Sequence, residues 1–164
     1  MRRTILVACA AALLLAACDP SPATPRATWD ALRAGIAARD GATLLRFHDT
    51  ETLVHRRQVI RDWRALLARG DAPEQVLGGT SLTVEEVVSG SPDDAVARLF
   101  AKHSPLLREG GWLGSATVAG ERMDGADACE LLLRGGDGKD FRLWLVVENG
   151  RWVIDHRRTW SPQK

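Results

Sequence analysis

The first third of the chain shows the spacing of apolar residues that is typical of amphipathic helices. Trp29, Leu32 and Ile36 recur at i, i+3 and i+7, which predicts a helix that begins near Ala27 with Thr28 as its N-cap. After an interruption at Asp40-Gly41 the helical pattern resumes over residues 42–48. A third helix is expected over residues 51–69, with a shared apolar face and a stop at Gly70-Asp71-Ala72-Pro73. The apolar residues of that third helix are Leu53, Ile60, Trp63 and Leu67.

Residues 80–110 carry mixed signals. Leu82, Val84 and Val87-Val88 suggest a strand, but Glu85-Glu86 breaks the strict alternation that a half-buried strand shows. Ser91-Pro92 followed by two acidic residues is typical of a helix start, because the proline fits the first turn and the carboxylates face the positive end of the helix dipole. We favour a helix over a strand here.

The last third predicts four consecutive strands, over residues 115–123, 128–134, 140–148 and 151–158. Asn149-Gly150 is a strong signal for a two-residue hairpin, because both turn positions need positive φ. A turn at this place sets the register of the last two strands. The expected pairs are Glu148 with Arg151, Val147 with Trp152, Leu145 with Ile154 and Leu143 with His156.

These elements predict an α+β domain with N-terminal helices packed on one face of a curved antiparallel meander sheet. The opening "WDALRAGIAARDGATLLRFHD" and the closing "FRLWLVVENGRWVID" resemble the two ends of nuclear transport factor 2-like (cystatin-like) domains. The resemblance spans about residues 27–158, within a single domain expected at 27–160. It implies a cone-shaped cavity between helices and sheet, which some members use for isomerisation or hydrolysis.

The N-terminus has the composition of an export signal. Met1-Arg2-Arg3 precedes an apolar run that ends at Ala17 and is shorter than the roughly 20 residues of a spanning helix. "LAAC" at residues 15–18 resembles the lipobox of bacterial lipoproteins, which implies a signal peptide over residues 1–17 and an acylated Cys18. The other reading is an ordinary secreted protein.

The residues that follow the lipobox suggest where the protein is held. Residues 18–26, rich in proline, form a short tether. An Asp at the position of Asp19 resembles the signal that retains lipoproteins in the inner membrane. We therefore expect lipid anchoring at the periplasmic face of the inner membrane, with the outer membrane as the alternative.

Charge and cysteine content narrow the function classes. The chain has 22 basic and 21 acidic residues, and removal of residues 1–17 takes away Arg2 and Arg3 and leaves 20 against 21. A net charge near −1 gives no electrostatic case for binding nucleic acid.

After acylation of Cys18, Cys129 is the one remaining thiol. We expect it in the core, on the apolar side of a strand.

The histidines and acids outline a candidate pocket. The spacing of His48, His55, His103 and His156 matches no zinc motif, so we expect neither a metal nor another cofactor. His156 is either a boundary residue or the lip of a pocket that also includes Phe47 and Trp63. The chain has no tyrosine, so the tyrosine-containing oxyanion hole of isomerases in the resembled family has no counterpart. Asp49, His48 and His156 are the candidate acid–base residues of an enzyme, which we rank last.

The second face of the predicted hairpin is mixed in character. Trp144, Arg142 and Arg157 lie on it and either pack there or anchor a protein partner. The third helix carries several arginines, which form either a solvated face or a surface for anionic lipid. They are Arg56, Arg57, Arg61, Arg64 and Arg69.

The sequence thus predicts a membrane-anchored exported lipoprotein whose domain binds without catalysis. The first expectation is a module that docks an envelope protein, as an assembly factor or as an immunity protein. The alternative is a carrier that holds a small apolar ligand in the helix–sheet cavity, and an isomerase or hydrolase comes third. The pattern carries no prediction of oligomeric state.

Overall fold

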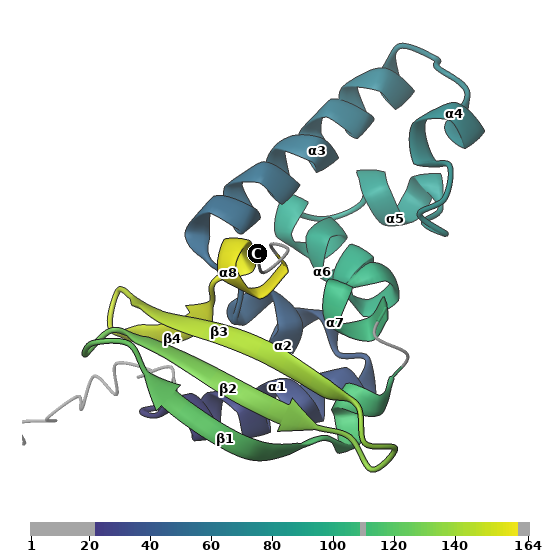
Figure 1. Ribbon diagram of the computed structural model, residues 1–164. Helices are drawn as coiled ribbons and strands as arrows, with labels where there is room; N and C mark the ends of the chain where they lie inside the picture. Colours follow the sequence, from purple (N-terminus) through teal and green to yellow (C-terminus); the bar gives the residue numbers. More distant parts are fainter. Residues whose placement is uncertain (1–21, 109–110, 161–164) are drawn as a thin grey trace, which may run out of the picture.

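The computed structural model describes residues 22–108 and 111–160, so the predicted signal peptide, Cys18 and Asp19 lie outside the described residues. Helices precede an antiparallel sheet and one short helix follows it, which confirms the expected α+β class (Figure 1). The helices before the sheet are α1 (Pro25–Ala38), α2 (Gly41–Arg46), α3 (Thr50–Ala68), α4 (Pro73–Leu77), α5 (Val84–Val88), α6 (Pro92–His103), α7 (Pro105–Arg108) and the short 3-10 helix η1 (Trp112–Ser115). The sheet contains β1 (Thr117–Met123), β2 (Ala128–Arg134), β3 (Asp140–Glu148) and β4 (Arg151–Ile154), and α8 (His156–Trp160) follows it.

Short polar side chains set the starts of the first helices. The cap of α1 is Thr24, whose hydroxyl accepts from the backbone N–H of Ala27, whereas the expected cap Thr28 is buried within the helix. Asp40 caps α2 and accepts from Ala42 and Thr43. The neighbouring Gly41 is required by packing, because a Cβ there would lie 1.8 Å from the carbonyl oxygen of Ala97 in α6.

The regular structure within residues 80–108 is helical, as α5, α6 and α7. The helix favoured at Ser91 is confirmed, with a capping box between Ser91 and Asp94. The strand signal around Leu82 is not realised, because a second capping box, between Thr83 and Glu86, starts α5 instead. Glu86, one of the two acidic residues that interrupt the strand alternation, thus completes the capping box of α5.

The four strands form a meander in the order β1-β2-β3-β4. The predicted hairpin is confirmed: Asn149 and Gly150 have φ of 52° and 74°, and Glu148 pairs with Arg151. The predicted pairing of Leu143 with His156 is wrong, because β4 ends at Ile154. The sheet is not strongly curled, in contrast to the cone that the resemblance implies.

A buried acid explains why the last strand stops early. Asp49 accepts a hydrogen bond from the backbone N–H of His156, at 3.0 Å, and so holds the first residue of α8. The preceding residues are held as well, since Ile154 donates to the carbonyl of Phe47. The chain therefore leaves the sheet towards α3, and α8 lies beside β3 where a longer β4 would have paired.

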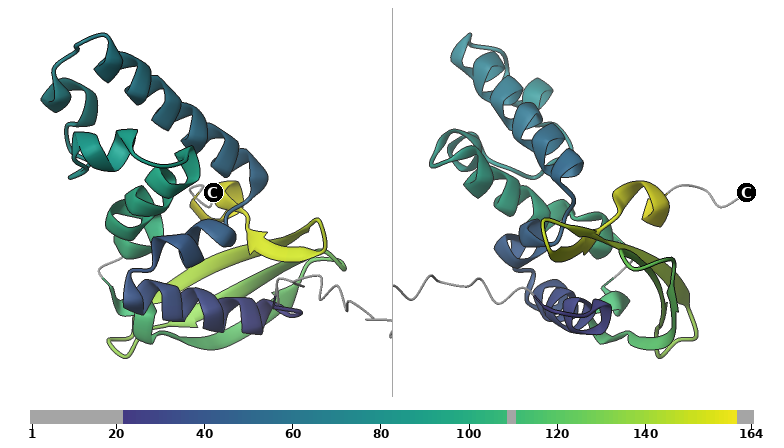
Figure 2. Two further views of the ribbon diagram at one scale, coloured as in Figure 1. Left: turned by 180° about the vertical axis from the view of Figure 1, so that it is seen from behind. Right: turned by 90° about the vertical axis from the view of Figure 1, so that its left-hand side faces the viewer.

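Helices α1 and α2 lie on one face of the sheet, and the helices from α3 to α6, termed the helical lobe, extend beyond its upper edge (Figures 1 and 2). The main core fills the space between α1, α2, α6 and the sheet. It includes Cys129, which is fully buried as expected, and burial raises the pKa of its thiol. A smaller core inside the helical lobe consists of Leu77, Leu82, Val87 and Leu99. The opposite face of the sheet faces the viewer in Figure 1 and, among residues 22–108 and 111–160, carries no helix except α8 at its upper edge.

Candidate functional site

The uncovered face of the sheet, termed the outer face, centres on Trp144 of β3. Its half-buried ring lies between two guanidinium groups, Arg122 of β1 at 5.8 Å and Arg158 of α8 at 5.0 Å from the ring centroid. Glu130 of β2 is the direct cross-strand neighbour of Trp144 and is 9% exposed. It forms ion pairs with Arg122 at 2.8 Å and Arg142 at 3.3 Å. One acid therefore orders two arginines around the tryptophan.

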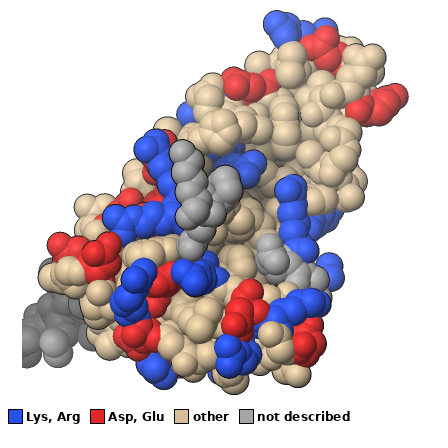
Figure 3. Space-filling view, in the orientation of Figure 1, with Lys and Arg blue, Asp and Glu red and all other residues tan. Residues whose placement is uncertain are grey.

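This arrangement follows from strand alternation and register. Arg122 is paired with Glu130 across β1 and β2, and Glu130 is paired with Trp144 across β2 and β3, so the three side chains share one face. Figure 3 shows basic and acidic side chains interspersed over the sheet, without a large area of one sign. An ordered set of arginines and a tryptophan loses little side-chain entropy on binding, which suits a docking surface.

The structure divides the predicted interface residues. Trp144 and Arg142 lie on the outer face. The strand position expected for Arg157 is wrong, because this residue belongs to α8 and forms an ion pair with Glu51 of α3 at 2.6 Å. Its neighbour Arg158 takes the place beside Trp144. Sequence reasoning missed Arg158 and Arg122, since the first requires α8 and the second requires the register of β1 on β2.

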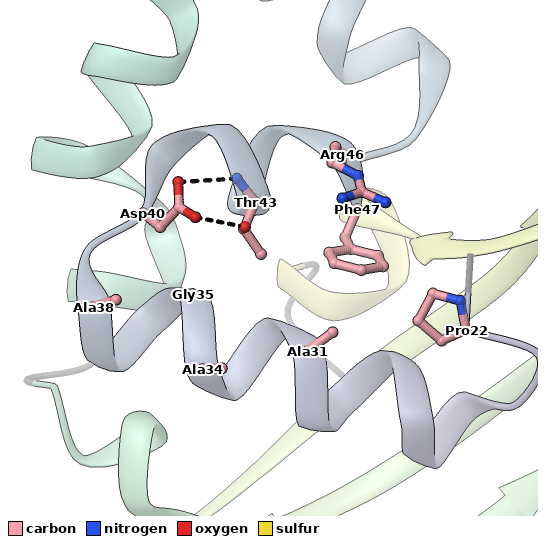
Figure 4. A pocket seen from close by; sticks show the side chains of 9 residues that line it. All are labelled: Pro22, Ala31, Ala34, Gly35, Ala38, Asp40, Thr43, Arg46 and Phe47. Carbon is pink, nitrogen blue, oxygen red and sulfur yellow. Dashed lines mark hydrogen bonds between the residues drawn. The ribbon is translucent and has the colours of Figure 1, made fainter. Parts of the chain in front are cut away.

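The three predicted pocket residues line separate hollows. Phe47 borders an open hollow of about 390 Å³ between α1 and α2 (Figure 4). That hollow is lined mainly by small side chains of α1, and Asp40 accepts from Thr43 at its end. Trp63 lines a hollow of about 160 Å³ in the helical lobe, and His156 lines one of about 180 Å³ between α3 and α8.

His48 joins these regions through a row of rings. It is 2% exposed, with its ring centroid 4.4 Å from that of Phe100 and 6.2 Å from that of His156. His156 continues the row towards Trp160 and Phe141. Neither ring nitrogen of His48 has a hydrogen-bond partner among the described residues. Burial, assisted by the charge of His156, lowers the pKa of His48 to about 3, so the ring is neutral at pH 7.

The structure brings together the candidate acid–base residues Asp49, His48 and His156, but it uses the acid as a helix cap. The carboxylate of Asp49 accepts from the backbone N–H of Thr52, at 2.6 Å, and from that of His156. Burial alone would raise the pKa of Asp49, but these two N–H donors outweigh it and hold the pKa below its ordinary value. Asp49 therefore connects the start of α3 to the start of α8. With its pKa lowered by these two hydrogen bonds, its carboxylate is a weak base.

The arginines of α3 differ in what they contact. Arg64 donates to four backbone carbonyls, one in α5 and three in the turn that leads to α6, and Arg57 pairs with Asp93 of α6. These two residues hold the helical lobe together and are not part of a free basic surface. Arg56 is half-buried, and its Nε is buried with no partner among the described residues. Burial lowers the pKa of Arg56, and the nearby charge of Arg108 lowers it further.

No helix in residues 22–108 and 111–160 has both the length and the hydropathy that a membrane span requires. No group of three histidine, cysteine or acidic side chains in the same ranges is arranged to hold a metal ion. Comparison of the chain with protein families, curated proteins and solved structures found no match.

Proposed function

We propose that this protein is a lipid-anchored module of the bacterial cell envelope that docks a protein partner through its outer face. The observation that carries the proposal is Trp144, held between Arg122 and Arg158 on a sheet face that α1 to α7 leave uncovered. Tryptophan and arginine dominate the energetically important centres of protein interfaces. Ion pairs with Glu130 hold Arg122 and Arg142 in place before a partner arrives.

The proposed anchor limits where that partner lies. Because α1 starts at Pro25, the tether expected at residues 18–26 is shortened to residues 18–24, which would reach at most about 22 Å if extended at roughly 3.1 Å per residue. The tether leads into α1, whose Arg26 pairs with Glu121 of β1 at 2.6 Å. The edge strand β1 thus lies next to the start of α1, where the tether joins the domain. A partner in the membrane or at its surface lies within reach of the outer face, a role that fits an assembly factor or an immunity protein.

Kinship with nuclear transport factor 2-like domains is part of the same proposal. The order of elements supports it, because helices come first and an antiparallel meander with a tight final hairpin comes last. The weak curl of the sheet speaks against the cone-shaped cavity of that family. A binding role on the sheet surface needs no such cavity.

Anchoring is tested by Cys18→Ser. We expect the variant to remain unprocessed or to leave the membrane fraction, because a single lost acylation site removes the anchor. Immunoblots of fractionated cells, with Ser21→Ala as the control substitution in the tether, measure the distribution. A Cys18→Ser protein that matures normally and stays in the membrane contradicts the anchor.

Docking is tested by affinity purification of the acylated protein from native membranes. A partner that the wild type and Val54→Ala retain should be lost with Trp144→Ala and Arg142→Ala. Val54 is an exposed apolar residue of α3, outside the sheet, and serves as the control. With the partner purified, titration calorimetry should show binding weakened about 30-fold by Trp144→Ala, the effect of an interface centre. Recovery of the same proteins with all four forms, or of none, counts against docking through this face.

A further inference from the structure

A second set of polar groups, separate from the outer face, surrounds the hollow of about 160 Å³ in the helical lobe. Arg56 of α3 and Arg108 of α7 contribute two guanidinium groups to its wall, and His103 of α6 contributes an imidazole. Trp63, Leu99 and Phe100 form the apolar part of the wall. Figure 3 shows basic side chains bordering the middle of the molecule, where the helical lobe meets the sheet.

The basic groups of this hollow are not neutralised by its described lining. Those lining residues include no aspartate or glutamate. Arg108 lies close enough to Arg56 for its charge to disfavour the protonated form of Arg56. Two buried nitrogen atoms, Nε of Arg56 and Nε2 of His103, have no hydrogen-bond partner among the described residues. The like charges of Arg56 and Arg108 and the unsatisfied Nε–H of Arg56 both cost free energy, and an anion between the two guanidinium groups lowers both costs.

Two carboxylates of the described residues, those of Asp49 and Glu51, lie near Arg56 and contact other groups. On its far side Arg56 borders the hollow of about 180 Å³, which contains Asp49 and Glu51. Asp49 accepts from two backbone N–H groups, and Glu51 pairs with Arg157. Neither acid forms a hydrogen bond or ion pair with Arg56, so neither of them neutralises its guanidinium.

We propose that this hollow binds a small organic acid, with its carboxylate between Arg56 and Arg108 and a compact apolar group against Trp63 and Phe100. Guanidinium groups match the planar, two-oxygen geometry of a carboxylate. The volume equals that of about five water molecules at roughly 30 Å³ each, which suits an acid of benzoate size. A neutral molecule leaves the guanidinium groups without a counter-charge, and inorganic phosphate leaves the apolar wall without a contact.

Isothermal titration of the purified protein with benzoate tests the proposal, with benzyl alcohol and inorganic phosphate as comparison ligands. We expect saturable binding of benzoate with a dissociation constant of about 1 mM or below. Benzyl alcohol and phosphate should each bind about tenfold more weakly, because each lacks one of the two matching parts. The absence of saturable benzoate binding overturns the proposal, and so does equal binding of either comparison ligand.

Variants separate this site from other surfaces. Arg56→Gln and Arg108→Gln should each weaken benzoate binding about tenfold or more. Arg61→Gln is the matched control, because Arg61 is exposed on α3 and, among the described residues, its hydrogen bonds go to Gln58 of the same helix. Arg108 is itself exposed, so its variant keeps the test decisive even if Arg56→Gln does not fold. Unchanged binding by Arg108→Gln, or an equal loss in Arg61→Gln, overturns the assignment. The outcome is independent of docking at Trp144, which the benzoate titration does not involve.

Discussion

Replacement of His48 by leucine is expected to stabilise the protein and to reduce the dependence of its stability on pH. The imidazole is almost fully buried against Phe100, and both of its nitrogens lack partners among the described residues. A polar group buried without a hydrogen bond costs about 1–3 kcal/mol. Leucine has a similar size and no polar atoms, so the variant should be about 1 kcal/mol more stable at pH 7.

The pH dependence follows from the protonation of the two states. Burial lowers the pKa of His48 from 6.5 to about 3 in the folded protein. Below the unfolded pKa the unfolded chain binds a proton that the folded protein does not bind. The free energy of unfolding therefore is highest above about pH 6.5 and falls as the pH decreases towards 3. Between pH 7 and pH 5, His48 alone should account for a loss of about 2 kcal/mol.

Urea unfolding followed by tryptophan fluorescence at pH 7 and pH 5 measures both effects. His48→Gln is the matched variant: it should lose the same part of the pH dependence as His48→Leu but gain little stability, because it keeps a buried polar group. The pKa of His156 is also lowered, chiefly by burial, so some pH dependence remains in both variants. The difference between wild type and variant isolates His48. If His48→Leu shows the same loss between pH 7 and pH 5 as the wild type, the neutral buried state is wrong.

Three further substitutions test the packing by urea unfolding at pH 7. Arg64→Met should lower the free energy of unfolding by about 2–3 kcal/mol, because it leaves four carbonyls without their charged donor. The control Arg61→Met, at an exposed position, should change it by less than about 0.5 kcal/mol. Equal effects of the two substitutions contradict the role of Arg64. Gly41→Ala should cost about 3 kcal/mol, since its Cβ would overlap the backbone of α6, and a variant as stable as the wild type would show that α2 and α6 are not so close. Asp49→Ala should cost about 1–2 kcal/mol through the lost caps of α3 and α8, and no loss would refute the capping role.

Much of the secondary structure was predictable because its signals are local. The hairpin at Asn149-Gly150 and the helix start at Ser91-Pro92 depend on residues within four positions of each other. The end of β4 was not predictable, because it depends on Asp49, which lies 107 residues before the His156 N–H that it accepts from. A strand pattern that continues to residue 158 was therefore replaced by a tertiary contact and a short helix.

The candidate sites divide in the same way. Strand alternation placed Trp144 and Arg142 on the outer face, and apolar spacing placed Trp63 and Cys129 in packed surroundings. The partners of these residues were not predictable from the sequence. Arg122, Arg158 and Glu130 lie near Trp144 only when three strands and α8 have assembled. The same holds for Arg56 and Arg108, which are separated by 52 residues and face one hollow.

The sequence by itself determined that helices precede a four-strand antiparallel sheet and set the register of the last hairpin, since propensity, capping and turn chemistry act over a few residues. It also carries the lipobox resemblance at Cys18, which depends on adjacent residues of the sequence and on no tertiary contact. Only the tertiary structure decided which of the many arginines are structural and which face a hollow. The reason is physical: a guanidinium at the end of a long, flexible stem can reach several acids and carbonyls, and only the packing of the elements decides which of them lie within hydrogen-bond distance.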